Sequence, residues 1–113
     1  MQYYNEEKMH NLRLVIEKEI LSWSGVTTKK MFGCPCYKYK TKLFAFLVTD
    51  GIVLTKASEQ DKMKLSKEFS IKLFRAATRT MKGWPQIPLD VTSDITKIIP
   101  FIKKSYNQSK TLI

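Results

Sequence analysis

The sequence predicts an α+β fold, a two-layer sandwich in which an antiparallel sheet carries helices on one face. In three segments the apolar residues recur at every third or fourth position, which is typical of amphipathic helices. Between these segments the apolar residues alternate with polar ones, or form short runs that end at turn residues, which is typical of strands. The elements follow the order α-β-β-β-α-β-β-α, which indicates a single domain over residues 1–113.

The first helix is expected over residues 5–23. Asn5 can accept a hydrogen bond from the first turn, and Glu6 and Glu7 lie at the positive end of the helix dipole. Gly25 follows the last periodic apolar residue and ends the helix.

Three strands are expected next. Residues 31–40, MFGCPCYKYK, alternate aromatic and basic side chains in their second half, as a strand with one solvent-facing side does. Residues 42–48, KLFAFLV, are more continuously apolar and predict a central strand. The turn signal TDG at 49–51 leads into a third strand over residues 52–56.

The second half of the chain predicts one polar helix, two strands and a last helix. The polar helix is expected over residues 58–69, and the strands over residues 71–76 and 81–90. Residues 92–106 carry isoleucines at helical spacing and should form the last helix. Residues 107–113 are expected to be a flexible tail.

The order of these motifs resembles the TfoX N-terminal domain family. The resemblance rests on MFG at 31–33, LFAFLVTDGIVL at 43–54 and PLD at 88–90, and it covers residues 12–106. It implies a small α+β domain that stands alone in many microbes, and it supplies no catalytic residues. The competence regulators that name the family have a second, helical domain. This chain is expected to lack that domain, because it stops at Ile113, so a role in competence gene control does not carry over.

Cys34 and Cys36 are the only cysteines, and two interpretations of them stay open. As a redox or metal site they would need a low thiol pKa, which Lys29, Lys30 and Lys38 would favour. A zinc site is not indicated, because the sequence has one Cys-x-Cys unit and no second pair. We favour the other interpretation, in which both thiols share one strand face and act as small buried hydrophobes.

The net charge is +10, and most of it lies in two regions. Residues 26–49 hold five lysines and no acidic residue, and residues 70–113 hold eight Lys or Arg and two Asp. A surface of this charge favours an anionic partner, either nucleic acid or an acidic protein. The candidate polyanion-binding residues are Lys29, Lys30, Lys38, Lys40, Lys42, Arg75, Arg79 and Lys82.

Aromatic residues lie close to these cations in the sequence. Tyr37, Tyr39 and Trp84 could stack on the exposed bases of a single strand. The period-two alternation favours a different arrangement for the two tyrosines, in which they face the core while the lysines face solvent.

The sequence carries no motif of a common enzyme class. His10 is the only histidine and has no acid placed to orient it, which argues against a Ser-His or Cys-His pair. The four glycines form no phosphate-binding loop or dinucleotide fingerprint, so we expect neither an enzyme nor a cofactor. No apolar run reaches the roughly 18 residues that span a bilayer, and the N-terminus does not resemble a signal peptide. We therefore expect a cytoplasmic protein without a membrane partner.

Taken together, these features predict a non-enzymatic, cytosolic binding or regulatory domain that acts on nucleic acid or on a protein partner. The alternative is a thiol-dependent redox or metal-binding protein that uses Cys34 and Cys36. A homodimer formed through an exposed edge strand is a further arrangement that the predicted sheet permits.

Overall fold

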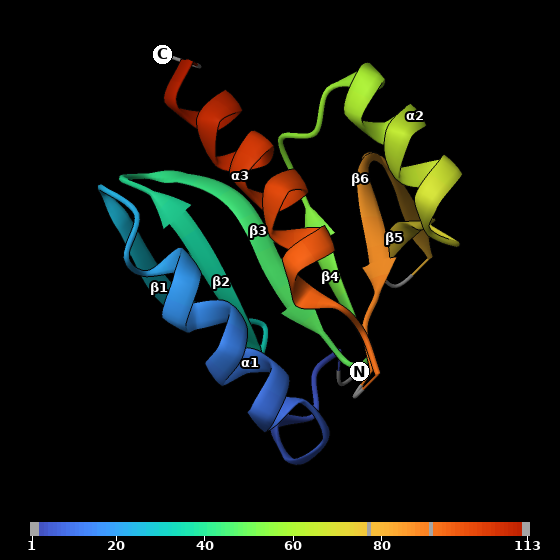
Figure 1. The fold of residues 1–113 in the computed structure, drawn as a ribbon. Helices are drawn as coiled ribbons and strands as arrows, with labels where there is room; N and C mark the ends of the chain where they lie inside the picture. Colours follow the sequence, from blue (N-terminus) through green and yellow to red (C-terminus); the bar gives the residue numbers. More distant parts are fainter. Residues whose placement is uncertain (1–2, 77, 91, 112–113) are drawn as a thin grey trace.

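The computed structural model describes residues 3–76, 78–90 and 92–111 (Figure 1). Within these residues, three helices and six strands follow the order α-β-β-β-β-α-β-β-α. Their bounds are α1 Glu6–Ile20, β1 Val26–Met31, β2 Cys34–Tyr39, β3 Lys42–Val48, β4 Gly51–Leu54, α2 Glu59–Glu68, β5 Lys72–Ala76, β6 Arg79–Pro88 and α3 Ile95–Thr111. The predicted α+β class is confirmed, with one strand more than the sequence predicts.

The strands of the described residues form one antiparallel sheet in the order β1-β2-β3-β4-β6-β5. The strand that the sequence analysis missed is β1. Its sequence, VTTKKM, contains β-branched residues but no apolar alternation, and its four middle residues are exposed. It is held at the edge of the sheet by pairing with β2, from Val26↔Tyr39 to Met31↔Cys34. Backbone pairing of this kind leaves no pattern of buried side chains in the sequence.

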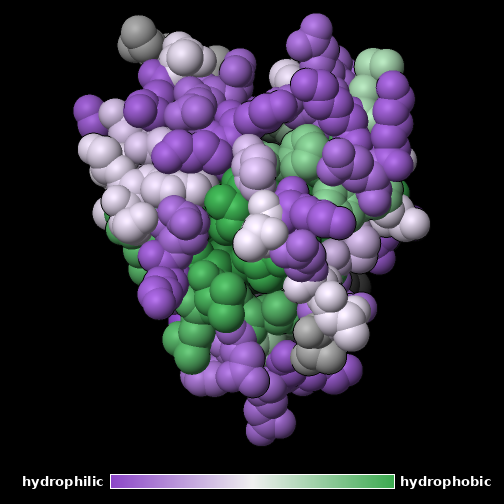
Figure 2. Space-filling view, in the orientation of Figure 1, coloured by the Kyte–Doolittle hydropathy of each residue, from purple (hydrophilic) through white to green (hydrophobic). Residues whose placement is uncertain are grey.

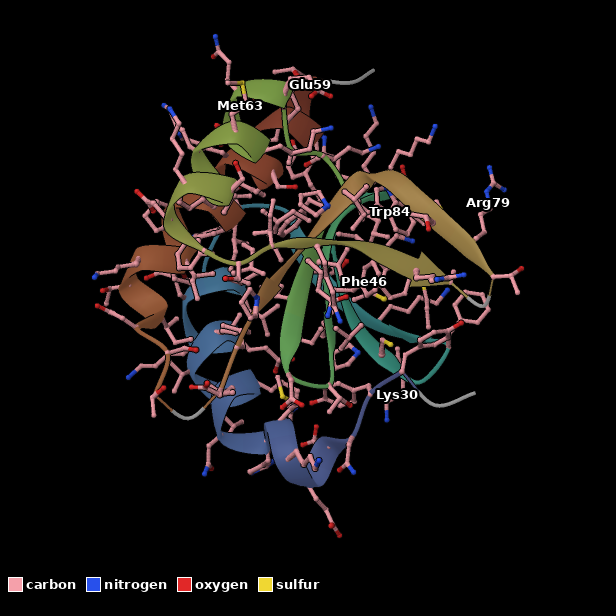
Figure 3. All side chains as sticks on the ribbon, turned by 90° about the vertical axis from the view of Figure 1, so that its right-hand side faces the viewer. Lys30, Phe46, Glu59, Met63, Arg79 and Trp84 are labelled. Carbon is pink, nitrogen blue, oxygen red and sulfur yellow. The ribbon has the colours of Figure 1, made fainter. Side chains whose placement is uncertain are left out.

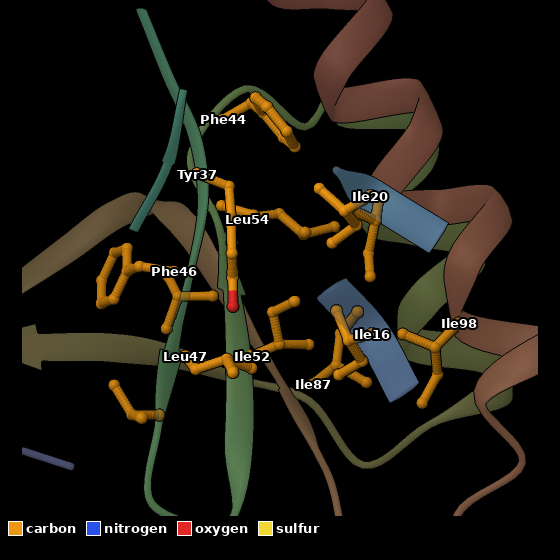
Figure 4. Close-up of a cluster of buried hydrophobic side chains, with 14 of the residues drawn as sticks. Ile16, Ile20, Tyr37, Phe44, Phe46, Leu47, Ile52, Leu54, Ile87 and Ile98 are labelled. Atoms are coloured by element: carbon orange, nitrogen blue, oxygen red, sulfur yellow. The ribbon is translucent and has the colours of Figure 1, made fainter. Parts of the chain in front are cut away.

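One face of the sheet forms the main core with the helices. Figure 4 shows Leu54 pointing toward Ile20 of α1, and Tyr37, Leu54, Ile16 and Ile20 are all buried. The Tyr37 hydroxyl donates a hydrogen bond to Glu17 of α1 at 2.7 Å, which satisfies the polar end of a buried ring.

The opposite face of the central strands is also apolar, and the β5–β6 hairpin covers it. The Phe46 side chain points away from the helices in Figure 4. Figure 3 shows the helices on one side of the sheet and the hairpin extending on the other. The Phe46 ring centroid lies 5.0 Å from that of Phe74 and 5.7 Å from that of Trp84, both edge to face. The helices themselves stay on one face, as predicted.

The outer surface of the helix layer is partly apolar. Figure 2 views this side and shows hydrophobic side chains gathered near the middle of the face. On α1, Leu14 is 49% exposed and Val15 is 54% exposed, so the apolar stripe of this helix is wider than the face it buries. Single exposed apolar residues are common on protein surfaces.

Helix α3 is longer than the sequence predicts. The expected flexible tail, residues 107–113, is helical as far as Thr111, and residues 112 and 113 lie outside the described residues. Ser109 is buried in this part of the helix, and its hydroxyl donates a hydrogen bond to the Tyr106 carbonyl. A tail was expected because the last residues of a chain commonly fray, and a polar residue such as Ser109 gives no sign in the sequence that it is buried.

Two glycines with positive φ lie at opposite ends of β1, and they differ in how closely other atoms approach them. Gly25 has φ +77° and Gly33 has φ +79°. A Cβ at Gly25 would lie 2.7 Å from Cε1 of Tyr39, whereas a Cβ at Gly33 would have no neighbour within 4 Å.

Gly33→Ala should therefore lower the free energy of unfolding by about 1 kcal/mol through its backbone conformation alone. Gly25→Ala should lower it by a further 1–3 kcal/mol, roughly the penalty for overpacking. Urea unfolding of both variants measures the difference, and equal losses would contradict the steric explanation.

Candidate functional site

An apolar pocket of about 290 Å³ lies between the β5–β6 hairpin and the face of the sheet that points away from the helices. Its walls come from the N-terminal segment, from β1, β2 and β3, and from the hairpin. The lining residues are Tyr3, Met31, Phe32, Cys34, Cys36, Leu43, Phe46, Phe74, Ala76, Met81 and Trp84.

Strands β2 and β3 form the floor of the pocket. Cys36 pairs with Phe46 across the two strands, so both side chains project from the same face. Cys34 lies two positions from Cys36 and shares that face. A bulge in this strand pair brings Lys38 opposite Leu43, which extends the apolar floor.

Aromatic residues of the hairpin and the N-terminal segment form the roof. The Phe74 and Trp84 ring centroids are 6.2 Å apart, and the Tyr3 ring lies 5.7 Å from Phe74. The Thr49 amide donates to the Tyr3 carbonyl at 2.9 Å, which ties the N-terminal segment to the end of β3. These ring contacts hold the roof in place before any ligand enters.

The two-residue turn between β1 and β2 contributes Phe32. Phe32 has φ +52° and Gly33 has φ +79°, the left-handed conformation that a tight hairpin turn requires at both positions. A bulky residue rarely adopts it. The Phe32 side chain is nevertheless 86% exposed, although it also lines the pocket. The turn conformation alone would favour Asn or Gly at position 32. We therefore attribute the phenylalanine to its place in the pocket lining.

The two thiols are free and buried, with Cys34 3% exposed and Cys36 4% exposed. Burial, helped by the neighbouring Cys36, raises the pKa of Cys34 to about 11. Burial also raises the pKa of Cys36, and a backbone hydrogen bond from Met31 and the charge of Lys38 offset this only in part. The pKa of both thiols is therefore raised on balance, whereas a redox or metal site would need it lowered. Both cysteines are buried on one strand face, as the preferred interpretation expects of them.

Metal binding has little support from the surroundings of the thiols. Among the described residues, no three His, Cys, Asp or Glu side chains gather closely enough to hold a metal ion. Cys34 and Cys36 would thus be the only protein ligands from one chain, and both would have to lose a proton in an apolar site.

Two of the candidate polyanion-binding residues lie on the pocket face of the sheet. Lys29 pairs with Cys36 across β1 and β2, so its side chain leaves the sheet on the same side as that thiol. Lys38 pairs with Leu43, which lines the pocket, and is therefore also on this side.

The three cations of the hairpin are placed differently. Arg75 is exposed between two residues that line the pocket, and so projects from the outer surface of β5. Arg79 lies near the tip of the hairpin, with its side chain extending away from the pocket (Figure 3). Lys82 is exposed on β6.

The three remaining candidates lie elsewhere again. Lys30 points away from the pocket in Figure 3. Lys40 is in the turn between β2 and β3, where its Nζ lies 5.4 Å from the Tyr39 ring centroid, and Lys42 pairs with Tyr39. The eight candidate cations therefore do not share one face, and the single patch considered from the sequence is not formed.

The aromatic residues considered for base stacking are occupied by other contacts. Tyr37 is fully buried against α1, as the alternation favoured. Tyr39 is half-buried, with its ring 5.7 Å from that of Tyr106. Trp84 is half-buried in the pocket wall. Tyr37 is therefore closed to a base, and the rings of Tyr39 and Trp84 are partly covered by other aromatic rings.

Sequence reasoning did not single out Phe46 or Phe74 as site residues. The available signal was the run KLFAFLV, which is apolar on both faces of its strand and therefore requires cover on both sides. Phe46 lies on the side that the helices do not cover. Nothing in the sequence pattern shows that the cover leaves a pocket.

No protein-family model, curated protein or solved structure matches this chain. The resemblance to the TfoX N-terminal domain family therefore rests on the sequence motifs alone. In the parts of the chain that the structure describes, no helix is long and apolar enough to cross a membrane.

Thiol reactivity should follow from the burial of the two cysteines. The folded protein should react slowly with iodoacetamide at neutral pH, because a pKa of about 11 leaves little Cys34 thiolate. The rate should rise as the pH approaches that value. The same chain in denaturant should alkylate at both cysteines as ordinary thiols do, with a pKa of about 8.5. Fast alkylation of the folded protein at neutral pH would instead indicate an activated thiol and support the redox alternative.

Proposed function

We propose that this chain is a non-enzymatic binding domain that takes one small, largely apolar molecule into the pocket between the sheet and the β5–β6 hairpin. The observation that carries the proposal is the lining itself. Its polar side-chain groups are two protonated thiols, one phenol and one indole, and the described lining residues include no carboxylate, imidazole or amine that could act as a catalytic acid or base.

The volume suits a ligand of limited size. The side chains leave about 290 Å³ of apolar space in this pocket, which is partly open to solvent. An apolar cavity of roughly 150 Å³ stays dry and binds benzene. A molecule with one aromatic ring and a short chain would therefore fill this pocket, which lies at the lower end of ligand-site volumes.

Packing provides the driving force. Lining atoms that face an unfilled space lose van der Waals contacts, and an apolar ligand restores them. The rings of Phe46, Phe74 and Trp84 already contact one another, so little ordering of the walls accompanies binding. Edge-to-face geometry leaves ring faces and edges available to an aromatic ligand.

The proposal keeps the non-enzymatic binding role expected from the sequence and changes the partner. The candidate cations do not gather on one face, and the aromatic side chains near them are not exposed, so neither observation favours nucleic acid. A regulatory role of the kind suggested by the TfoX N-terminal resemblance would then depend on whether the pocket is occupied.

Binding of phenylbutanol, a neutral molecule with one ring and a short chain, tests the proposal by isothermal titration calorimetry. We expect saturable binding with one site per chain. Ala76→Phe places a ring inside the pocket and should weaken binding at least about tenfold, since it occupies the ligand's volume.

Thr80→Phe is the matched control, because Thr80 pairs with the outward-facing Arg75 on the same hairpin. This variant should bind phenylbutanol as the unmodified chain does. Thermal unfolding shows whether both variants are folded. Absence of saturable binding, or equal binding by Ala76→Phe, would overturn the proposal.

A further inference from the structure

Lys29 and Lys38 lie on the pocket face of the sheet, and they indicate the charge of the ligand, which the apolar lining does not. Lys29 lies directly opposite Cys36 in the β1–β2 pair. Cβ atoms of directly opposed residues are roughly 5 Å apart, so the Lys29 side chain starts beside a thiol that lines the pocket. Its flexible four-carbon stem lets the ammonium group reach the edge of the pocket while staying in water.

Lys38 approaches the same thiol from the other direction. It lies two positions from Cys36 along β2, and its partner across the sheet, Leu43, lines the pocket. The positive charge of Lys38 opposes the rise in the pKa of Cys36 that burial causes, as expected for a cation on the same strand face. The two lysines thus flank Cys36, one across the strand pair and one along the strand.

Neither lysine forms an ion pair with another of the described residues. Within the described residues, the ion pairs of lysines are those of Lys62 with Glu59 and of Lys104 with Asp61. Residues 26–49 contain no acidic residue, and the hairpin segment 70–89, on the other side of the pocket, contains none either. Cations at the edge of an apolar cleft act in a low-dielectric surrounding and attract counter-ions.

We propose, on the basis of the proposed function, that the ligand is an apolar carboxylate whose body fills the pocket and whose carboxylate meets Lys29 and Lys38 at its edge. An apolar body and a single anionic head match the two parts of the site. A monoanion suits it better than a phosphate dianion, because the apolar lining offers no cluster of backbone amides to replace the larger hydration of a phosphate.

The test compares phenylbutyrate with phenylbutanol, which share the ring and chain and differ in the head group. At low ionic strength, phenylbutyrate should bind about fivefold more tightly, the size expected for two partly exposed ion pairs. Raising the salt concentration to about 0.5 M should remove most of this preference through screening, and should leave phenylbutanol binding nearly unchanged.

Substitutions assign the preference to the two lysines. Lys29→Gln and Lys38→Gln should each lower phenylbutyrate affinity about twofold, and the double variant should bind the two molecules equally well. Lys30→Gln is the matched control, because Lys30 is the next residue along β1 and points away from the pocket. It removes the same charge and should keep the preference.

The outcomes separate this inference from the proposed function. If phenylbutanol binds as tightly as phenylbutyrate at low salt, or if Lys30→Gln loses as much preference as the double variant, the carboxylate assignment is overturned while the pocket stands. If neither molecule binds, the proposed function fails and the inference fails with it.

Discussion

Strands β2 and β3 are buried on both faces, and the alternation of side chains along them divides the interior into two parts. Tyr37 and Ala45 pair on one side, where α1 and α3 complete the core. Cys36 and Phe46 pair on the other side, where no helix lies. An apolar strand face cannot stay in water without a penalty of about 25 cal/mol for each Å², so this second face must also be covered. The β5–β6 hairpin provides that cover, and the pocket exists because two strands fill less space than a layer of helices.

The hairpin reaches this position through a narrow attachment. It joins the rest of the sheet by three pairs between β4 and β6, from Gly51↔Pro88 to Val53↔Gln86. Irregular pairing between Leu73 and Arg75 then lets the hairpin bend over the sheet. A ligand that touches Phe74 on the hairpin and Phe46 on the sheet would therefore add contacts between parts that the backbone links at one edge. Such a ligand would therefore stabilise the position that the hairpin already has.

Alternation made part of this arrangement predictable. Side chains two positions apart in any strand point to the same face, so both thiols share one face and Tyr37, between Cys36 and Lys38, points to the other. The curvature of the hairpin could not be predicted, since it depends on bulges that no residue type marks in this sequence. Strand β1 was missed because its side chains are exposed and only its backbone is paired. Lys29 lies beside Cys36 because of that pairing. The excess of basic residues therefore identified Lys29 as a candidate, but it could not show that Lys29 lies beside Cys36.

The Cys-Pro-Cys sequence is explained by the same pairing. The Lys40 amide donates to the Gly25 carbonyl at 3.1 Å, and hydrogen-bonded pairs alternate along the β1–β2 ladder from that point. The Lys30↔Pro35 pair therefore falls at a position without hydrogen bonds, and the proline nitrogen faces away from β1. Pairing of β2 with β3 starts at Cys36, so no ladder bond is lost on that side either. Proline restricts the backbone to an extended conformation here and keeps Cys34 and Cys36 on the pocket face, where two protonated, polarisable thiols form part of an apolar wall.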